Sequence, residues 1–146
     1  MKKFATLFMA LLLIIGVAAA RDRISTNVAD LPQAAQQFIS RHFPKVKVNH
    51  IKIDDKSFGR TEYDVVLDNG TQIDFNSKGE WRDVECGYRA VPDEIVMPEI
   101  RKYVAANYSN AKIVTIEKDD GNYNIQLNSG LELEFNRAGQ FLRIDD

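Results

Sequence analysis

The sequence predicts an α+β fold, in which a tandem repeat of one helix and a four-stranded antiparallel meander forms one eight-stranded antiparallel sheet with both helices on one face. The first observation is a duplication, because residues 63–81 recur in modified form as residues 123–141 with the same glycine positions. The second is an amphipathic helical pattern ahead of each copy. The third is size, since a half of roughly 55 residues has only a marginal core of its own and is expected to share a sheet with the other half.

The N-terminus is typical of a secretory signal. Lys2 and Lys3 precede an apolar run over residues 4–17, and residues 18–20 form an A-x-A cleavage site. A membrane anchor is the alternative, but the run is shorter than the roughly 20 residues that a spanning helix needs. We therefore expect a signal peptide over residues 1–20, a periplasmic location, and no membrane span after the signal is removed.

The remaining chain, residues 21–146, is predicted to be a single domain made of two repeats, about 30–85 and 92–146. Without Lys2 and Lys3, 17 of the 19 basic residues remain against 21 acidic ones, a net charge of −4. This charge does not attract nucleic acid or an anionic membrane.

Cys86 is the only cysteine, so no disulfide can form within one chain. Two interpretations are open for this residue in an oxidising compartment. It is either a buried apolar side chain or one end of a bridge between two chains.

Apolar stripes and end signals predict the two helices. Apolar residues recur at i, i+3, i+4 and i+7 over residues 31–43, and a similar stripe covers residues 96–108. Asp30 can cap the first helix with Pro32 in its first turn, and Pro44 ends that helix.

The register of the meanders follows from the requirement that apolar residues share one face. A three-residue loop ending in Gly70 pairs Val65 with Ile73 and Tyr63 with Phe75, whereas a two-residue loop would mix the two faces. The same rule predicts four further pairs: Ile125–Leu133, Tyr123–Phe135, Phe75–Trp81 and Phe135–Phe141. The strands that precede the meanders, near residues 46–53 and 111–118, alternate imperfectly, which predicts bulged or edge strands.

Nothing in the sequence predicts catalysis or a metal centre. The only histidines, His42 and His50, fit no nucleophile–base pattern and no zinc or copper spacing. The Asp54–Asp55 and Asp119–Asp120 pairs are typical of turns, and calcium binding there is the alternative, although EF-hand spacing is absent. We therefore expect no enzymatic activity, no catalytic residues, no metal site and no cofactor.

The sheet face turned away from the helices is the candidate binding surface. In the predicted register Asp64 lies opposite Asp74, and such like-charge pairs are destabilising. Arg82 is expected opposite Asp74 on the next strand, where it offsets part of this repulsion. The face is either merely solvated or receives a partner protein or a cationic ligand, and the predicted contact residues are Glu62, Asp64, Asp74, Arg82, Glu132 and Glu134.

A five-residue insertion distinguishes the first copy from the second. It places Phe58 at a hairpin tip between Lys56 and Arg60. An exposed aromatic residue in a basic loop is suited to anchoring a partner. The alternative is that the loop folds back onto the sheet edge.

Several motifs carry a resemblance to a known family: Leu31-Pro32, Phe38-Ile39, Phe43-Pro44, Gly70 to Trp81, Cys86, Val91-Pro92 and Tyr123 to Ile144. Through them the chain resembles the PepSY-like family of secreted proteins, also described as beta-lactamase-inhibitor-like (BLIP-like). The resemblance covers nearly the whole mature chain and implies an inhibitor-like fold in a Gram-negative periplasm. It implies no catalytic residue, and its link to inhibition is an analogy of fold, which does not establish function.

Together these patterns predict a secreted periplasmic binding module that recognises or inhibits another envelope protein through the open sheet face. The alternative is an envelope protein that binds a small ligand or a cation.

Overall fold

The computed structural model describes residues 21–145, so the predicted signal peptide over residues 1–20 lies outside the described residues. The elements in chain order are β1 (Arg21–Ser25), the 3-10 helix η1 (Val28–Asp30), α1 (Gln33–His42), β2 (Val48–Lys56), η2 (Ser57–Gly59), β3 (Arg60–Leu67), β4 (Gln72–Phe75), β5 (Trp81–Glu85), η3 (Asp93–Ile95), α2 (Pro98–Asn107), β6 (Ile113–Asp119), β7 (Asn122–Leu127), β8 (Glu132–Phe135) and β9 (Phe141–Asp145).

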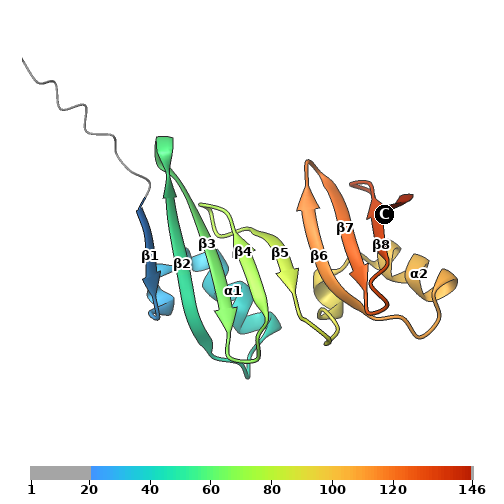
Figure 1. Ribbon diagram of the computed structural model, residues 1–146, viewed down its shortest axis with the longest axis horizontal. Helices are drawn as coiled ribbons and strands as arrows, with labels where there is room; N and C mark the ends of the chain where they lie inside the picture. The colour runs from blue at the N-terminus through green and yellow to red at the C-terminus, as the bar shows by residue number, and fades with distance from the viewer. Residues whose placement is uncertain (1–20, 146) are drawn as a thin grey trace, which may run out of the picture.

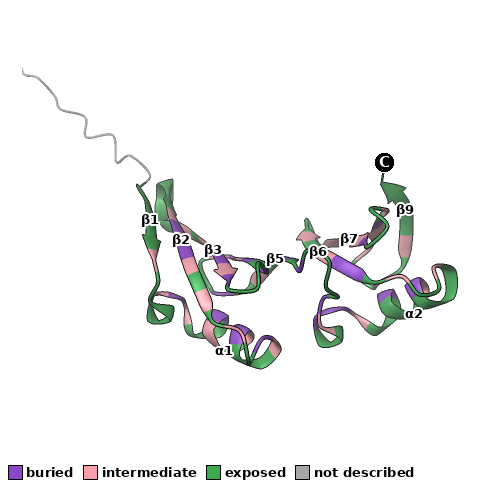
Figure 2. Ribbon diagram, turned by 60° about the horizontal axis from the view of Figure 1, so that its bottom comes forward, coloured by how far each residue is buried: buried purple, intermediate pink, exposed green. Residues whose placement is uncertain are grey.

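The strands form one antiparallel sheet in sequence order, β1 to β9 (Figure 1). Both helices lie on the same side of this sheet (Figure 2). The predicted α+β class is therefore confirmed. We call the side without helices the open face.

The predicted number of eight strands was wrong by one. The additional strand, β1, pairs with the outer edge of β2 and places Arg23 opposite Ile53. None of the side chains of β1 is buried, so the strand has no apolar alternation by which it could be recognised in the sequence. Since residues 21–25 extend the sheet at its edge, they leave the open face uncovered.

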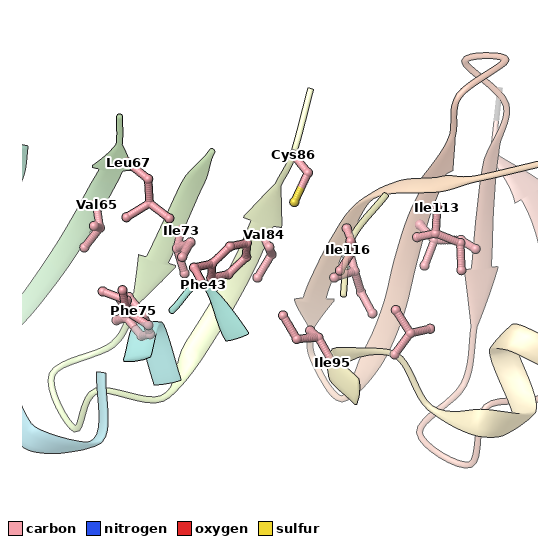
Figure 3. Packing of buried hydrophobic residues seen from close by; sticks show 14 of the residues in the cluster. Phe43, Val65, Leu67, Ile73, Phe75, Val84, Cys86, Ile95, Ile113 and Ile116 are labelled. Atoms are coloured by element: carbon pink, nitrogen blue, oxygen red, sulfur yellow. The ribbon is translucent and has the colours of Figure 1, made fainter. Parts of the chain in front are cut away.

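The two halves join through β5 and β6, as the expectation of one continuous sheet requires. Three residue pairs connect these strands: Asp83–Glu117, Val84–Ile116 and Glu85–Thr115. Beyond them, the backbone N–H of Cys86 donates to the Val114 carbonyl at 2.9 Å. Figure 3 shows Val84 between the apolar side chains of the first half and Ile116 of the second. The apolar core therefore continues across the joint.

The registers of both meanders are as predicted. Val65 lies opposite Ile73 and Tyr63 opposite Phe75, and the other four expected pairs also form. At the first loop, the Leu67 N–H donates to the Thr71 carbonyl at 2.8 Å. Gly70 has a φ of +85°, the left-handed conformation that a three-residue loop of this kind needs.

The strands that precede the meanders are bulged, as predicted, but they are not edge strands. The register shifts between Val48 and His50 in β2 and between Ile113 and Thr115 in β6. Both strands have neighbours on two sides, because β1 covers β2 and β5 covers β6.

The predicted cap of the first helix was wrong. α1 begins at Gln33 after Pro32, which has no side-chain capping bond, and Asp30 instead ends η1. Leu31 and Pro32 are both extended, so they separate Asp30 from the helix. The Asp30 carboxylate accepts a hydrogen bond from the Ser25 hydroxyl at 2.5 Å.

Each helix places one aromatic ring on the aromatic ladder of its half. Phe38 lies edge-on to Phe75, with ring centroids 5.6 Å apart. Tyr103 lies 5.4 Å from Phe135 and stacks on Phe141 at 4.6 Å. Because edge-to-face and stacked rings stabilise beyond simple burial, these contacts fix where each helix crosses the sheet.

The close approach of α1 to the β4–β5 turn predicts a difference between two glycine substitutions. A Cβ on Gly79 would lie 2.8 Å from Pro32 Cβ, whereas a Cβ on Gly70 would meet nothing within 4 Å. Both residues have positive φ. We expect Gly79→Ala to lower the free energy of unfolding by roughly 2–5 kcal/mol, from backbone strain and overpacking together.

Gly70→Ala is the matched control and should cost only about 1–2 kcal/mol, from backbone strain alone. Urea denaturation of both variants measures the difference. Equal losses would contradict the packing of α1 against this turn.

Candidate functional site on the open sheet face

A row of polar side chains crosses the open face, because these residues alternate with the buried apolar ladder. In register, each member lies opposite the next on the adjacent strand: Asp64, Asp74, Asp83, Glu117, Asn124 and Glu134. We call the four consecutive carboxylates, Asp64, Asp74, Asp83 and Glu117, the acidic row. Like charges directly opposite each other on a sheet are destabilising, so the acidic row opposes folding rather than supporting it.

The predicted facing of Asp64 and Asp74 is confirmed, but the position of Arg82 was wrong. Asp83, not Arg82, lies opposite Asp74, because the register shifts at this point of the β4–β5 ladder. A bulge sets two residues of one strand against one of its neighbour. Asp74 therefore has a second carboxylate neighbour, Asp83, at the position where the compensating cation Arg82 was expected.

Asp83 and Glu117 belong to the site but were not predicted from the sequence. A signal for Asp83 exists, because Trp81 and Val84 are both directed to the core side although they are three residues apart. Such an odd spacing cannot arise in a regular strand of period two and indicates an extra residue. Glu117 is brought beside Asp83 only by the pairing of β5 with β6.

The other predicted contact residues lie around the acidic row. Glu62 forms an ion pair with Lys56. Glu132 lies opposite Gln126, in the row next to Glu134. Glu134 forms an ion pair with Arg143 at 2.7 Å, so its charge is already compensated.

Phe58 lies at the tip of the β2–β3 hairpin. Its side chain is 98% exposed, so the alternative in which the loop folds back onto the sheet edge was wrong. Its φ of +68° is uncommon for a residue with a large side chain, and the turn holds the ring away from the sheet.

Burial and mutual repulsion raise the pKa values of two carboxyl groups in the acidic row. The pKa of Asp74 is raised to about 6, chiefly by desolvation and then by the charge of Asp64. The pKa of Asp83 is raised to about 7 by desolvation and by the charges of Glu85, Asp74 and Glu117. Both groups therefore exchange protons near neutral pH.

Lys52 lies opposite Asp64 at the β2 end of the acidic row, but the described residues form no ion pair with the row. Among residues 21–145, no lysine or arginine forms an ion pair with any of its four carboxylates. Two buried oxygen atoms beside Glu117, Asp83 Oδ1 and Asn124 Oδ1, have no hydrogen-bond partner. Two hollows of about 410 and 450 Å³ flank the row, and Asp83 and Glu117 line both of them.

This arrangement can attract a positive charge, but it offers no nucleophile with an adjacent base. In the described part of the chain, no group of three or more His, Cys, Asp or Glu residues is arranged to hold a metal ion. The ring of His42 packs against Phe38 at 4.6 Å, and burial lowers its pKa. His50 Nδ1 lies 2.8 Å from Asn49 Oδ1.

Cys86 is only 2% exposed, and burial raises the pKa of its thiol. The interpretation of this residue as a buried apolar side chain is therefore confirmed. A thiol at this position does not reach the surface to form a bridge between chains.

Comparison with known proteins identifies the family. A family model described as "Putative beta-lactamase-inhibitor-like, PepSY-like" matches residues 61–143. The chain belongs to this family. A comparison with curated proteins found no match.

Three solved structures resemble this PepSY-like protein over nearly all of their length. Two come from Bacteroides vulgatus ATCC 8482. One is a "putative periplasmic protein of unknown function" with 40% sequence identity and a TM-score of 0.82. The match covers 86% of this chain and 100% of the other. The second is a "putative periplasmic protein from DUF2874 family" with 41% sequence identity and a TM-score of 0.80. The match covers 88% of this chain and 99% of the other.

The third structure is a "putative calcium-regulated periplasmic protein" from Bacteroides thetaiotaomicron. It is 37% identical, with a TM-score of 0.79, and covers 86% of this chain and 97% of that chain. All three descriptions support the predicted periplasmic location of this PepSY-like protein. Over residues 21–145, none of the helices has the length and apolar character needed to cross a membrane.

The raised pKa of Asp83 predicts a specific dependence of stability on pH. In the unfolded chain an aspartate titrates near its ordinary pKa, about 3.9, whereas in the folded protein Asp83 titrates at about 7. Between these values the folded state binds more protons, so the contribution of Asp83 to stability falls as pH rises from about 4 to about 7.

Asp83→Asn removes this contribution. We expect it to raise the free energy of unfolding at pH 8 by about 1–2 kcal/mol, after allowance for solvent screening, and to have little effect at pH 4. Urea denaturation at several pH values measures both, with the exposed loop variant Asp68→Asn as control. A gain that is the same at every pH would contradict the raised pKa.

Proposed function

We propose that this protein is a periplasmic binding module whose open face receives a positively charged surface of another envelope protein. The acidic row is the observation that carries the proposal. Four carboxylates on adjacent strands repel one another. Lys52 lies opposite the first of them, Asp64, but none of the four forms an ion pair within the described residues. A basic partner surface would remove this repulsion on binding, which favours both affinity and rapid association.

The dimensions of the acidic row favour a protein surface over a single small cation. Adjacent strands lie about 4.8 Å apart, so four carboxylates on β3 to β6 extend over about 14 Å. Two or three lysine or arginine side chains of a partner can lie along such a row. Arginine in particular pairs with carboxylates through two parallel hydrogen bonds.

The remaining predicted contact residues extend this surface. Phe58 provides an exposed aromatic ring at the tip of the β2–β3 hairpin, and such rings often carry much of the binding energy of an interface. Glu62, Arg82, Glu132 and Glu134 lie at its margins. In this proposal residues 1–20 export the chain, and the protein acts by binding without catalysing a reaction.

Calcium binding by the open face is the second candidate function. Two observations favour it. Asp83 Oδ1 and Asn124 Oδ1 are buried oxygen atoms without partners on either side of Glu117, and calcium takes six to eight oxygen ligands. The Bacteroides thetaiotaomicron relative is described as calcium-regulated.

Pull-down from periplasmic extract tests the leading proposal. The triple variant Asp64→Asn/Asp74→Asn/Asp83→Asn should lose a partner that the wild type retains, and that partner should have a basic surface. Raising the salt concentration should release the same partner, because exposed charges are screened.

A matched control makes the same change in charge on the helix side: Asp93→Asn/Glu94→Gln/Glu99→Gln. It should retain the partner. If both triple variants recover the same proteins as the wild type, the open face is not the binding surface.

Thermal unfolding with calcium tests the second candidate. Calcium should raise the Tm of the wild type in a saturable way, since a ligand that binds only the folded state stabilises it. Magnesium at the same ionic strength should have a smaller effect, and Asp83→Asn/Glu117→Gln should abolish the calcium effect. An unchanged Tm of the wild type in calcium would contradict calcium binding by the open face.

A further inference from the structure

Lys118 lies on the helix-covered side of the β5–β6 joint, and its side chain has no role in the interface proposed for the open face. Its ammonium group lies over the indole of Trp81, with Nζ 3.8 Å from the ring centroid. Burial lowers the pKa of Lys118. Throughout residues 21–145, no carboxylate lies within ion-pair distance of this lysine.

The fold itself does not require a lysine at this position. Lys118 lies opposite Tyr123 on the adjacent strand, and the corresponding position in the first half, opposite Tyr63, is Ile53. Ile53 is completely buried. Placing a charged group where an apolar one fits costs free energy unless the charge is paired. The contact with Trp81 recovers only part of that cost, since a cation–π contact does not replace the hydration of a buried ammonium group.

Lys118 is part of a pocket at one end of the sheet. In an antiparallel sheet the turns after β4, β6 and β8 lie at the same end, and residues of these three turns surround a cavity of about 460 Å³. Trp81 and Tyr123 are its aromatic members. We call this cavity the joint pocket.

The joint pocket has an excess of positive charge. Arg82, Lys118 and Arg137 line it together with two acids, Glu80 and Asp120, which gives a net charge of +1. None of the three cations takes part in an ion pair within the described residues.

Gly121 leaves the space that Arg137 occupies. A Cβ at Gly121 would lie 2.7 Å from Nη2 of Arg137, so the guanidinium group lies directly against the β6–β7 turn. The arginine therefore comes from a turn remote in sequence and still borders the cavity that contains Lys118.

We propose that the joint pocket binds a carboxylate attached to an apolar or aromatic body. One negative charge matches the net charge of the pocket. An ammonium and two guanidinium groups can donate charge-assisted hydrogen bonds to a carboxylate, and Trp81 and Tyr123 offer aromatic surface to the body of the ligand. Arg82 and Lys118 also border one of the two hollows beside the acidic row, whereas Trp81, Tyr123 and Arg137 line the joint pocket and neither of those hollows.

Intrinsic fluorescence tests the proposal directly, because Trp81 is the only tryptophan of the chain. The probe is N-acetyl-phenylalanine, titrated at constant ionic strength. It should change the emission of Trp81 in a saturable way. The amide of the same compound, which lacks the charge, and acetate, which lacks the aromatic body, should each bind about tenfold more weakly or worse.

Two variants locate the binding to the pocket. Lys118→Met keeps an unbranched side chain over Trp81, and Arg137→Gln alters an exposed turn residue. Each should weaken binding about tenfold or more, measured by fluorescence and by calorimetry. Lys78→Gln, a lysine of the β4–β5 turn outside the pocket, should bind as the wild type does. If Lys118→Met does not fold, the affinity of Arg137→Gln for the probe decides whether binding occurs in the joint pocket.

Three results would overturn the proposal: no saturable change with N-acetyl-phenylalanine, equal affinity for the acid and its amide, or wild-type affinity in Arg137→Gln. The triple variant of the acidic row should still bind the probe. Loss of a protein partner and loss of this probe are therefore separate outcomes.

Discussion

The pairing of β5 with β6 is the contact on which the rest of the structure depends. It joins two halves that are each small for an independent core, and it does so through only three residue pairs. The same pairs place Asp83 against Glu117 on one side of the sheet and Val84 against Ile116 on the other. One short ladder thus continues the core, completes the acidic row, and brings the turns of the two halves together around Lys118.

Much of the fold follows from the sequence because apolar alternation is a strong constraint when one sheet face is buried. The pairs Tyr63–Phe75 and Tyr123–Phe135 form as predicted, since a register shifted by one residue would set aromatic side chains opposite polar ones. The same constraint does not predict β1, because this strand buries no side chain. Apolar alternation also does not predict where α1 begins. Leu31 and Pro32 separate Asp30 from the helix, so Asp30 cannot cap it.

The candidate site was predicted only in part, and the reason is physical. Asp64 and Asp74 belong to one hairpin, so local register is enough to bring them together. Asp83 depends on a bulge that changes which residue faces Asp74, and Glu117 depends on contact between the halves. Polar residues on an open face have no packing partners that fix their register. Errors of one position therefore fall on the face where function is expected, while the buried face is predicted correctly.

The two sides of the joint present opposite electrostatic problems. On the open face, four carboxylates lie side by side and none forms an ion pair within the described residues. The pKa values of Asp74 and Asp83 rise towards neutrality. On the other side, Lys118 is partly buried and forms no ion pair within residues 21–145, and desolvation lowers its pKa. Both arrangements reduce the stability of the fold, and a single substitution such as Asp83→Asn would relieve the first. Charges that oppose folding are best explained by an interaction outside the fold. Their opposite signs on opposite sides of one ladder point to two ligands of opposite charge.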